Sequence, residues 1–171
     1  MIYICGLSTV LAAAAQVQPR YLISITDPET PAPQVPGIPP ARHLKLMFHD
    51  IDAPQSGYVA PQSDHIASLI AFAAGWDCQS PLLVHCHGGA SRSTAAAVIL
   101  QAVLMEGRER DVTHWLRTRA AHASPNRRMI ALADTLLARN GRLIAAVEAM
   151  GPAIRVGETE TVPLVRLWLE A

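Results

Sequence analysis

Residues 82–93 read LLVHCHGGASRS and mark a change of pattern in the chain. The apolar run that leads to His85 is typical of a buried strand, and the alanine-rich stretch after Ser93 is typical of a buried helix. Between them lie a thiol, several small residues and an arginine, with five residues separating Cys86 from Arg92. At such a strand–loop–helix junction, backbone N–H groups can surround an anion. The stretch therefore predicts an α/β fold with an anion site at the end of a strand.

The residue types of this loop suit a phosphate ester. A helix N-terminus and nearby cations favour the ionised, nucleophilic form of a thiol. Glycines permit tight turns, and the arginine offers paired donors to two phosphate oxygens. The hydroxyl of Ser93 would donate to the Cys86 sulfur and help the thiolate to leave. The predicted phosphate-binding positions are His87, Gly88, Gly89, Ala90, Ser91 and Arg92.

His85 and His87 raise the alternative of a metal site together with Cys86. Adjacent strand residues point to opposite faces of a sheet, so His85 and Cys86 should diverge. No second cluster of ligands stands out in the sequence. We therefore expect no metal and no cofactor. His85 is expected to orient the loop through ring hydrogen bonds, and His87 to face solvent.

Strands and helices alternate in the first half of the chain, and helices dominate the second half. Strands are expected at residues 2–5, 21–25, 44–48 and 82–85, and helices at 8–16, 61–75, 91–105, 111–120, 124–139 and 143–150, with Ser124 as the N-cap of the fifth helix. This order predicts a central, mostly parallel sheet of four to five strands flanked by helices, in a single domain spanning residues 1–171. Residues 28–40 include six prolines and should form a surface loop. Residues 151–171 should form a mostly irregular tail, extended at 163–169.

Composition narrows the range of partners. The 14 basic and 14 acidic residues cancel, whereas proteins that bind nucleic acid are usually basic, so no nucleic-acid partner is expected. The apolar N-terminal stretch is too short and interrupted to span a bilayer, and no basic segment precedes it as in a signal peptide, so no membrane contact is expected. Three scattered cysteines do not make a disulfide framework, which favours a cytoplasmic location. The sequence leaves the oligomeric state open.

The pattern His-Cys-x-x-Gly-x-Ser-Arg-Ser resembles the catalytic loop of the cysteine-dependent protein tyrosine phosphatases, especially the dual-specificity type. Residues 50–54, residues 124–126 and the overall layout are also similar to a group of small bacterial proteins identified as tyrosine phosphatases. The resemblance implies a phosphocysteine intermediate at Cys86, oxyanion binding by the loop amides and Arg92, and no metal. Gly88 and Ala90 depart from the residues usual in the family and should loosen the loop slightly.

Protonation of the leaving group needs a carboxylic acid near the loop. Asp50 and Asp52 both follow the strand expected at residues 44–48, and both precede Cys86 by the thirty-odd residues that the family shows. The family resemblance favours Asp50 as the acid, with Asp52 as the alternative. It also places Asn126 among the supporting residues.

Together these features predict a phosphate-monoester hydrolase that acts on phosphotyrosine or phosphoserine/threonine protein. The alternative substrate is a small phosphate ester, such as a nucleotide or sugar phosphate. A rhodanese-type sulfurtransferase and a non-catalytic phosphate-binding module are further alternatives. The loop contains no lysine, which argues against the relatives that act on phosphoinositides. Cys5 and Cys78 are candidates for a protective disulfide with an oxidised Cys86.

Overall fold

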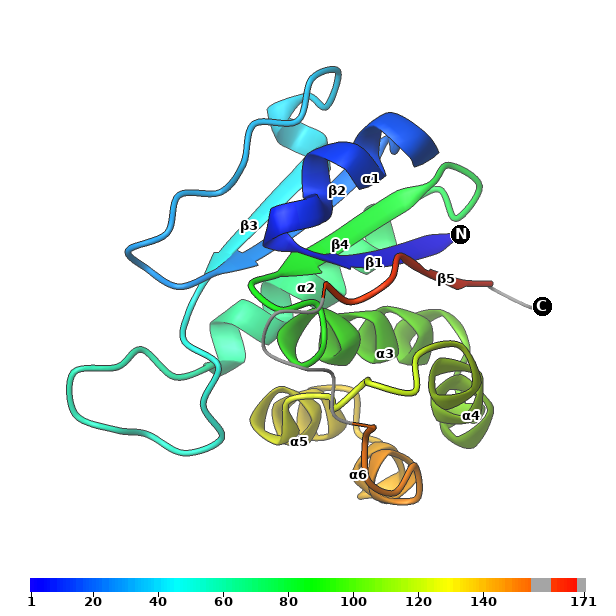
Figure 1. The fold of residues 1–171 in the computed structure, drawn as a ribbon. Helices are drawn as coiled ribbons and strands as arrows, with labels where there is room; N and C mark the ends of the chain where they lie inside the picture. The colour runs from blue at the N-terminus through cyan, green and yellow to red at the C-terminus, as the bar shows by residue number, and fades with distance from the viewer. Residues whose placement is uncertain (155–160, 169–171) are drawn as a thin grey trace.

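A five-stranded sheet forms the centre of the molecule (Figure 1), and the computed structural model describes residues 1–154 and 161–168. Its order is β3-β2-β4-β1-β5. The strands are β1 (Ile2–Gly6), β2 (Tyr21–Thr26), β3 (His43–Met47), β4 (Leu82–Cys86) and β5 (Val165–Leu167). The first four are parallel, and β5 runs antiparallel to β1. The predicted α/β fold with a mostly parallel sheet is confirmed.

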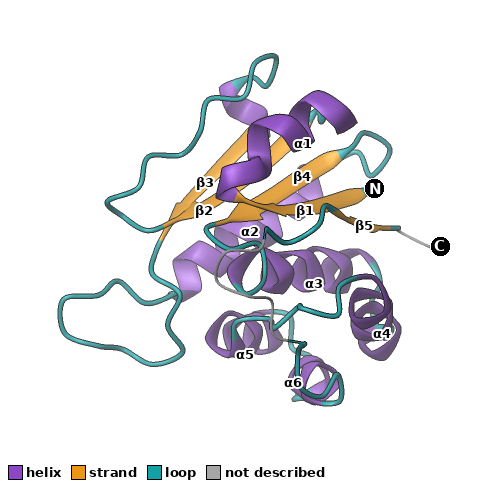
Figure 2. Cartoon of the chain, viewed as in Figure 1, coloured by secondary structure: helices purple, strands orange, loops and turns teal. Residues whose placement is uncertain are grey.

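Helices cover both faces of the sheet, but unequally (Figures 1 and 2). One face carries α1 (Val10–Val17), which follows the short 3-10 turn η1 (Leu7–Thr9) and so begins two residues later than expected. The opposite face carries α2 (Ser63–Gly75), α3 (Arg92–Leu104), α4 (Glu109–Arg119), α5 (Arg127–Leu136) and α6 (Arg142–Glu148). No helix within the described ranges is long and apolar enough to cross a membrane.

Strand β4 and helix α3 form the centre of the core. All five residues of β4 are buried, and so are the first eleven residues of α3, from Arg92 to Ala102. The alanines at 95–97 let the helix lie close to the sheet, and the larger side chains of Ile99 and Leu100 fill the space beyond them. Burial of each such side chain contributes about 1.5–3 kcal/mol. This packing fixes the loop that joins β4 to α3.

Two further segments pack against the sheet, one on its face and one at its edge. The proline-rich segment at residues 28–40 runs over the α1 face, where Val35 and Ile38 pack against the cluster formed by α1 and the sheet, and it ends in the 3-10 turn η2 (Pro40–Arg42). Within the tail predicted at 151–171, Val165 and Leu167 are buried in the edge strand β5. Residues 155–160 and 169–171 of that tail, including the end of the predicted extended stretch, lie outside the described residues.

Candidate active site

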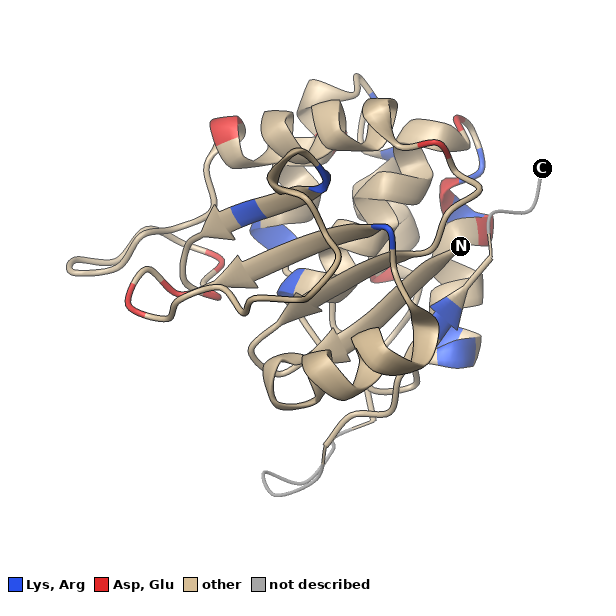
Figure 3. Ribbon diagram, turned by 90° about the horizontal axis from the view of Figure 1, so that it is seen from above, with Lys and Arg blue, Asp and Glu red and all other residues tan. Residues whose placement is uncertain are grey.

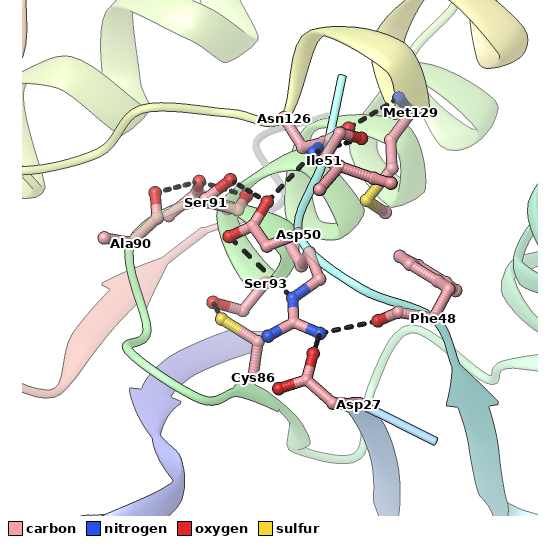
Figure 4. Close-up of polar contacts among 12 residues, drawn as sticks. Asp27, Phe48, Asp50, Ile51, Cys86, Ala90, Ser91, Ser93, Asn126 and Met129 are labelled. Carbon is pink, nitrogen blue, oxygen red and sulfur yellow. Dashed lines mark hydrogen bonds and ion pairs between the residues drawn. The ribbon is translucent and has the colours of Figure 1, made fainter. Parts of the chain in front are cut away.

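The Cys86 sulfur lies at the carboxyl end of β4, where the chain turns into α3 (Figure 4). Its Sγ accepts a hydrogen bond from the backbone N–H of Gly89 at 3.2 Å and lies 3.2 Å from the hydroxyl oxygen of Ser93. Gly89 belongs to the loop, and Ser93 belongs to the first turn of α3. We use "86–92 loop" for residues 86–92. The helix N-terminus at this loop carries partial positive charge.

The 86–92 loop is tied to the segments around it. The backbone N–H of Leu7 donates to the carbonyl of His87 at 3.0 Å, and that of Ser124 donates to the carbonyl of Ala90 at 2.8 Å. The hydroxyl of Thr94 donates to the carbonyl of Ala90 at 2.6 Å. These contacts fix the loop from η1, directly after β1, on one side and from the α4–α5 connection on the other.

The two loop glycines differ in their surroundings. Gly89 has a φ of +74°, and a Cβ there would lie 2.8 Å from the backbone of Cys5 and 2.6 Å from the side chain of Val162. Gly88 has open space around the same position. Glycine is therefore required at 89, whereas a side chain at 88 would meet no neighbouring atom.

Arg92 is buried beneath the loop, with 2% of its surface exposed. Its Nη1 donates to Oδ1 of Asp27 at 2.6 Å and to the carbonyl of Phe48, also at 2.6 Å (Figure 4). Neither Nε nor Nη2 donates to a residue in the described parts of the chain, and Nε lies 3.8 Å from Oδ2 of Asp50. One edge of the guanidinium is thus anchored, and the Nε–Nη2 edge remains for a bidentate oxyanion.

Asp27 was not predicted from the sequence. It follows β2 directly, and β2 is the neighbour of β4 in the sheet. Its position after a strand was a usable signal, because the carboxyl ends of parallel strands meet at one edge. The sequence alone does not give the strand order, however, so the contact between Asp27 and Arg92 could not be predicted from it.

Asp50 lies directly against the 86–92 loop. Its Oδ1 accepts hydrogen bonds from the hydroxyl of Ser91 at 2.7 Å and from the side-chain amide of Asn126 at 2.9 Å. Asp52 instead accepts from the backbone N–H groups of Arg127 at 3.0 Å and Arg128 at 3.4 Å, at the start of α5. Of the two candidate acids, Asp50 therefore contacts the loop, and Asp52 stabilises a helix terminus.

Asn126 links the acid to helix α5. Its Oδ1 accepts from the backbone N–H of Met129 at 2.9 Å, so Asn126 is the N-cap of α5. The sequence prediction of Ser124 as the N-cap was wrong. The backbone N–H of Ser124 is used by the loop carbonyl of Ala90, and the helix begins only at Arg127.

A polar cleft of about 250 Å³ lies beside these groups and is lined by Asp50, Asp52, Ser91, Ser124, Pro125, Asn126 and Arg127. Acidic residues also gather in the loops beyond the arrowheads of the strands, where Figure 3 shows red segments. Among them, Glu29 lies 3.4 Å from Nε2 of His49, which precedes Asp50. The cleft is therefore open, polar and flanked by carboxylates.

The two histidines that flank Cys86, His85 and His87, lie in different environments. His85 is fully buried, and its Nε2 lies 2.7 Å from the hydroxyl oxygen of Ser24. Burial is the main cause that lowers the pKa of His85 to about 4. His87 is exposed. Within residues 1–154 and 161–168, no three His, Cys, Asp or Glu side chains are placed to hold a metal ion.

The other two cysteines are free thiols. Cys5 is registered with His85 in the sheet and packs in the cluster on the α1 face, whereas Cys86 belongs to the core on the α3 face. Burial raises the pKa of Cys5 to about 12. Cys78 precedes β4, at the opposite end of that strand from Cys86.

Comparison with known proteins identifies solved structures that have a similar fold. No protein-family model and no curated protein sequence matches the chain. The structure of DUSP15 matches with a TM-score of 0.64 and 22% identity, over 92% of this chain and 94% of DUSP15. The chain has the fold of the dual-specificity phosphatases.

Other solved structures match over similar lengths. The human tyrosine phosphatase-like serine/threonine/tyrosine-interacting protein has a TM-score of 0.63 and 17% identity, over 81% of this chain and 92% of its own. PTPMT1 in complex with PI(5)P has a TM-score of 0.59 and 12% identity, over 82% and 94% respectively. The similarity to dual-specificity phosphatases thus covers most of the chain and concerns the fold.

Proposed function

We propose that the protein is a phosphate-monoester hydrolase that uses Cys86 as a nucleophile and acts on phosphotyrosine or phosphoserine/threonine protein. Hydrolysis of phosphate monoesters is extremely slow without a catalyst. The protein must therefore supply an ionised nucleophile, donors for the phosphate oxygens and a proton for the leaving group. Cys86, Arg92 with the loop amides, and Asp50 are the groups proposed for these three tasks.

In the first step, Sγ of Cys86 bonds to phosphorus while the phosphorus–oxygen bond to the leaving group breaks. Asp50 gives its proton to the departing oxygen. A phosphate dianion beside Asp50 would favour the protonated form of that acid, because like charges repel. The Nε–Nη2 edge of Arg92 and the loop N–H groups would hold the three remaining oxygens.

In the second step, water attacks the phosphorus of the phosphocysteine and the phosphorus–sulfur bond breaks. Asp50 takes the proton from the water. The Ser93 hydroxyl and the Gly89 amide, each 3.2 Å from Sγ, would stabilise the departing thiolate. No step requires a metal or a cofactor.

One observation supports this proposal above the others: Cys86, Arg92 and Asp50 converge at one edge of the sheet, and Ser91 links the 86–92 loop to Asp50 at 2.7 Å. An acid held against the loop suits ester hydrolysis and has no use in a rhodanese-type sulfur transfer or in a module that only binds phosphate. A small phosphate ester would undergo the same chemistry and is the alternative substrate.

The test is hydrolysis of an aryl phosphate by the full chain, in the presence of a chelator. Wild type should turn over, and Cys86→Ser should have no measurable activity because a hydroxyl in place of the thiolate is a poor nucleophile. Cys78→Ser, at the far end of β4, is the matched control and should retain wild-type rates. Full activity in Cys86→Ser would show the proposal to be wrong. A panel of phosphopeptides and small phosphate esters then separates the two substrate classes.

A further inference from the structure

The face of the sheet turned toward α1 carries two polar side chains that are completely buried. Ser24 on β2 and His85 on β4 are in register, and both have 0% exposure. Burying such groups without partners would cost several kcal/mol. They bond to each other, with 2.7 Å between Nε2 of His85 and Oγ of Ser24. Oγ of Ser24 lies 2.8 Å from Nε2 of the half-buried His43 on β3. The three side chains form a hydrogen-bonded row across three strands.

The surroundings of this row leave few other partners for it. On the β1 side, the residue registered with His85 is Cys5, whose raised pKa keeps it an uncharged thiol. On the β3 side, the residue registered with Ser24 is the exposed Lys45. The apolar cluster on this face, which includes Leu22 and Leu83, packs against α1 and the proline-rich segment. The row therefore runs from the edge of the sheet to the residue before Cys86.

The chemistry of the Ser24 hydroxyl couples the two hydrogen bonds of the row. A serine hydroxyl has one hydrogen, so one imidazole must donate to Ser24 and the other must accept from it. The Nδ1 of His85 makes no hydrogen bond of good geometry within the described residues.

The row holds His85 in one tautomer, because Nε2 of His85 must take the role toward Ser24 that Nε2 of His43 does not. Burial is the main cause that lowers the pKa of both imidazoles to about 4, and Lys45 lowers that of His43 further. Both rings are therefore neutral near pH 7, and the hydrogen bonds of the row are kept there.

We propose that Ser24 and His43 are positioning residues for the nucleophile: by fixing the tautomer and orientation of His85, they hold the backbone of Cys86 and thereby the place of its sulfur. This inference deepens the proposed function and rests on it. The contacts of Sγ with the Gly89 amide and the Ser93 hydroxyl are each at 3.2 Å, so a small movement of the Cys86 backbone weakens both. A thiolate with weaker donors forms at higher pH.

The experiment measures the rate at which iodoacetamide alkylates Cys86 in the full chain as a function of pH, with each cysteine peptide resolved by mass spectrometry. Ser24→Ala and His43→Leu should move the half-maximal pH upward by about 0.5 unit or more, which is about a threefold change in the ionisation equilibrium. Ser24→Thr and His43→Gln keep a hydroxyl and an N–H donor, and should stay close to wild type. Lys45→Gln changes a neighbouring residue outside the row and should leave the profile unchanged.

An unchanged profile in folded Ser24→Ala and His43→Leu would overturn the proposal, and so would an equal shift in Lys45→Gln. If Ser24→Ala does not fold, the comparison of His43→Leu with His43→Gln at the sheet edge decides the matter. The alkylation readout is independent of turnover. If the variants show the expected shifts but the wild-type protein hydrolyses no phosphate ester, the proposed function is overturned and the positioning row is supported. Normal hydrolysis without the shifts would overturn the row alone.

Discussion

Oδ1 of Asp27 lies 2.6 Å from Nη1 of Arg92, and this ion pair joins the end of β2 to the first residue of α3. The guanidinium is 3% exposed and the carboxylate 30%, so the arginine is the more deeply buried partner. The contact pairs the charge of Arg92 through Nη1, and its Nε makes no hydrogen bond within the described residues. Asp27 therefore holds the arginine that we propose binds the phosphate.

Replacing Asp27 by alanine should weaken phosphate binding and lower stability. A buried arginine without its partner loses about 1–3 kcal/mol, and its fork is no longer held in place. We expect kcat/KM for an aryl phosphate to fall at least about tenfold, which corresponds to about 1.4 kcal/mol, with a weaker Kd for inorganic phosphate. Asp27→Asn keeps an acceptor oxygen and should lose less. Equal kcat/KM in wild type and Asp27→Ala would contradict the assigned role.

The two candidate acids should differ in their effect on poor leaving groups. Asp50→Asn should slow the hydrolysis of an alkyl phosphate on the order of a hundredfold or more, and that of an aryl phosphate with a good leaving group by less. Asp52→Asn keeps an acceptor oxygen but removes a negative charge at the start of α5, so it should cost about 0.3–1 kcal/mol of stability and leave the rate within a few fold. Steady-state kinetics with both substrates and a thermal melt check these expectations. A larger rate loss in Asp52→Asn would move the acid to Asp52.

The two loop glycines provide a matched pair of variants. Gly89→Ala should abolish turnover or folding, because the new Cβ would lie 2.8 Å from the backbone of Cys5 and the residue would keep a φ that favours glycine. Gly88→Ala has open space around it and should retain activity close to wild type. Activity and circular dichroism of the two variants test the predicted contrast. Similar activity in both would show that the described loop backbone is not the active one.

The stability of the fold should fall as the pH drops below about 6.5. Burial is the main cause that lowers the pKa of His43, His65, His85 and His122 below the ordinary 6.5. A lowered histidine pKa means that the unfolded chain binds more protons, so this part of the stability is present above pH 6.5 and is lost toward pH 4. Denaturant unfolding at pH 7 and pH 5 should give a lower free energy at pH 5, with a smaller difference in His43→Gln. A free energy that is constant or higher at pH 5 would contradict the assignment.

Local patterns were enough to predict much of the fold. The apolar run before His85 and the alanine-rich stretch after Ser93 predicted β4 and α3, because each is buried almost completely and so has a continuous apolar sequence. The place of Asp50 and Asp52 after β3 was also predictable, and the resemblance to the phosphatases favoured Asp50 as the acid. What the sequence could not give is the order of the strands. The contacts of Asp27 with Arg92, and of Ser24 with His85, depend on β2 lying beside β4.

Small shifts at helix ends were also beyond local rules. Serine followed by proline is a common helix start, yet α5 begins after Asn126 because the Ser124 backbone bonds to the 86–92 loop. A tertiary contact took precedence over a local preference there. Asn126, the observed N-cap, also donates to Asp50. The difference from the predicted helix start therefore lies within the candidate site.

The central claim is that Cys86 carries the phosphoryl group between the two chemical steps. The most direct measurement is rapid acid quenching of the full chain during turnover of a radiolabelled phosphate ester, followed by mass spectrometry of the labelled peptide. Label should appear on Cys86 alone, should be absent in Cys86→Ser, and should accumulate in Ser93→Ala, where the thiolate leaves more slowly. Steady turnover with no label on Cys86, or with label on another residue, would contradict the account.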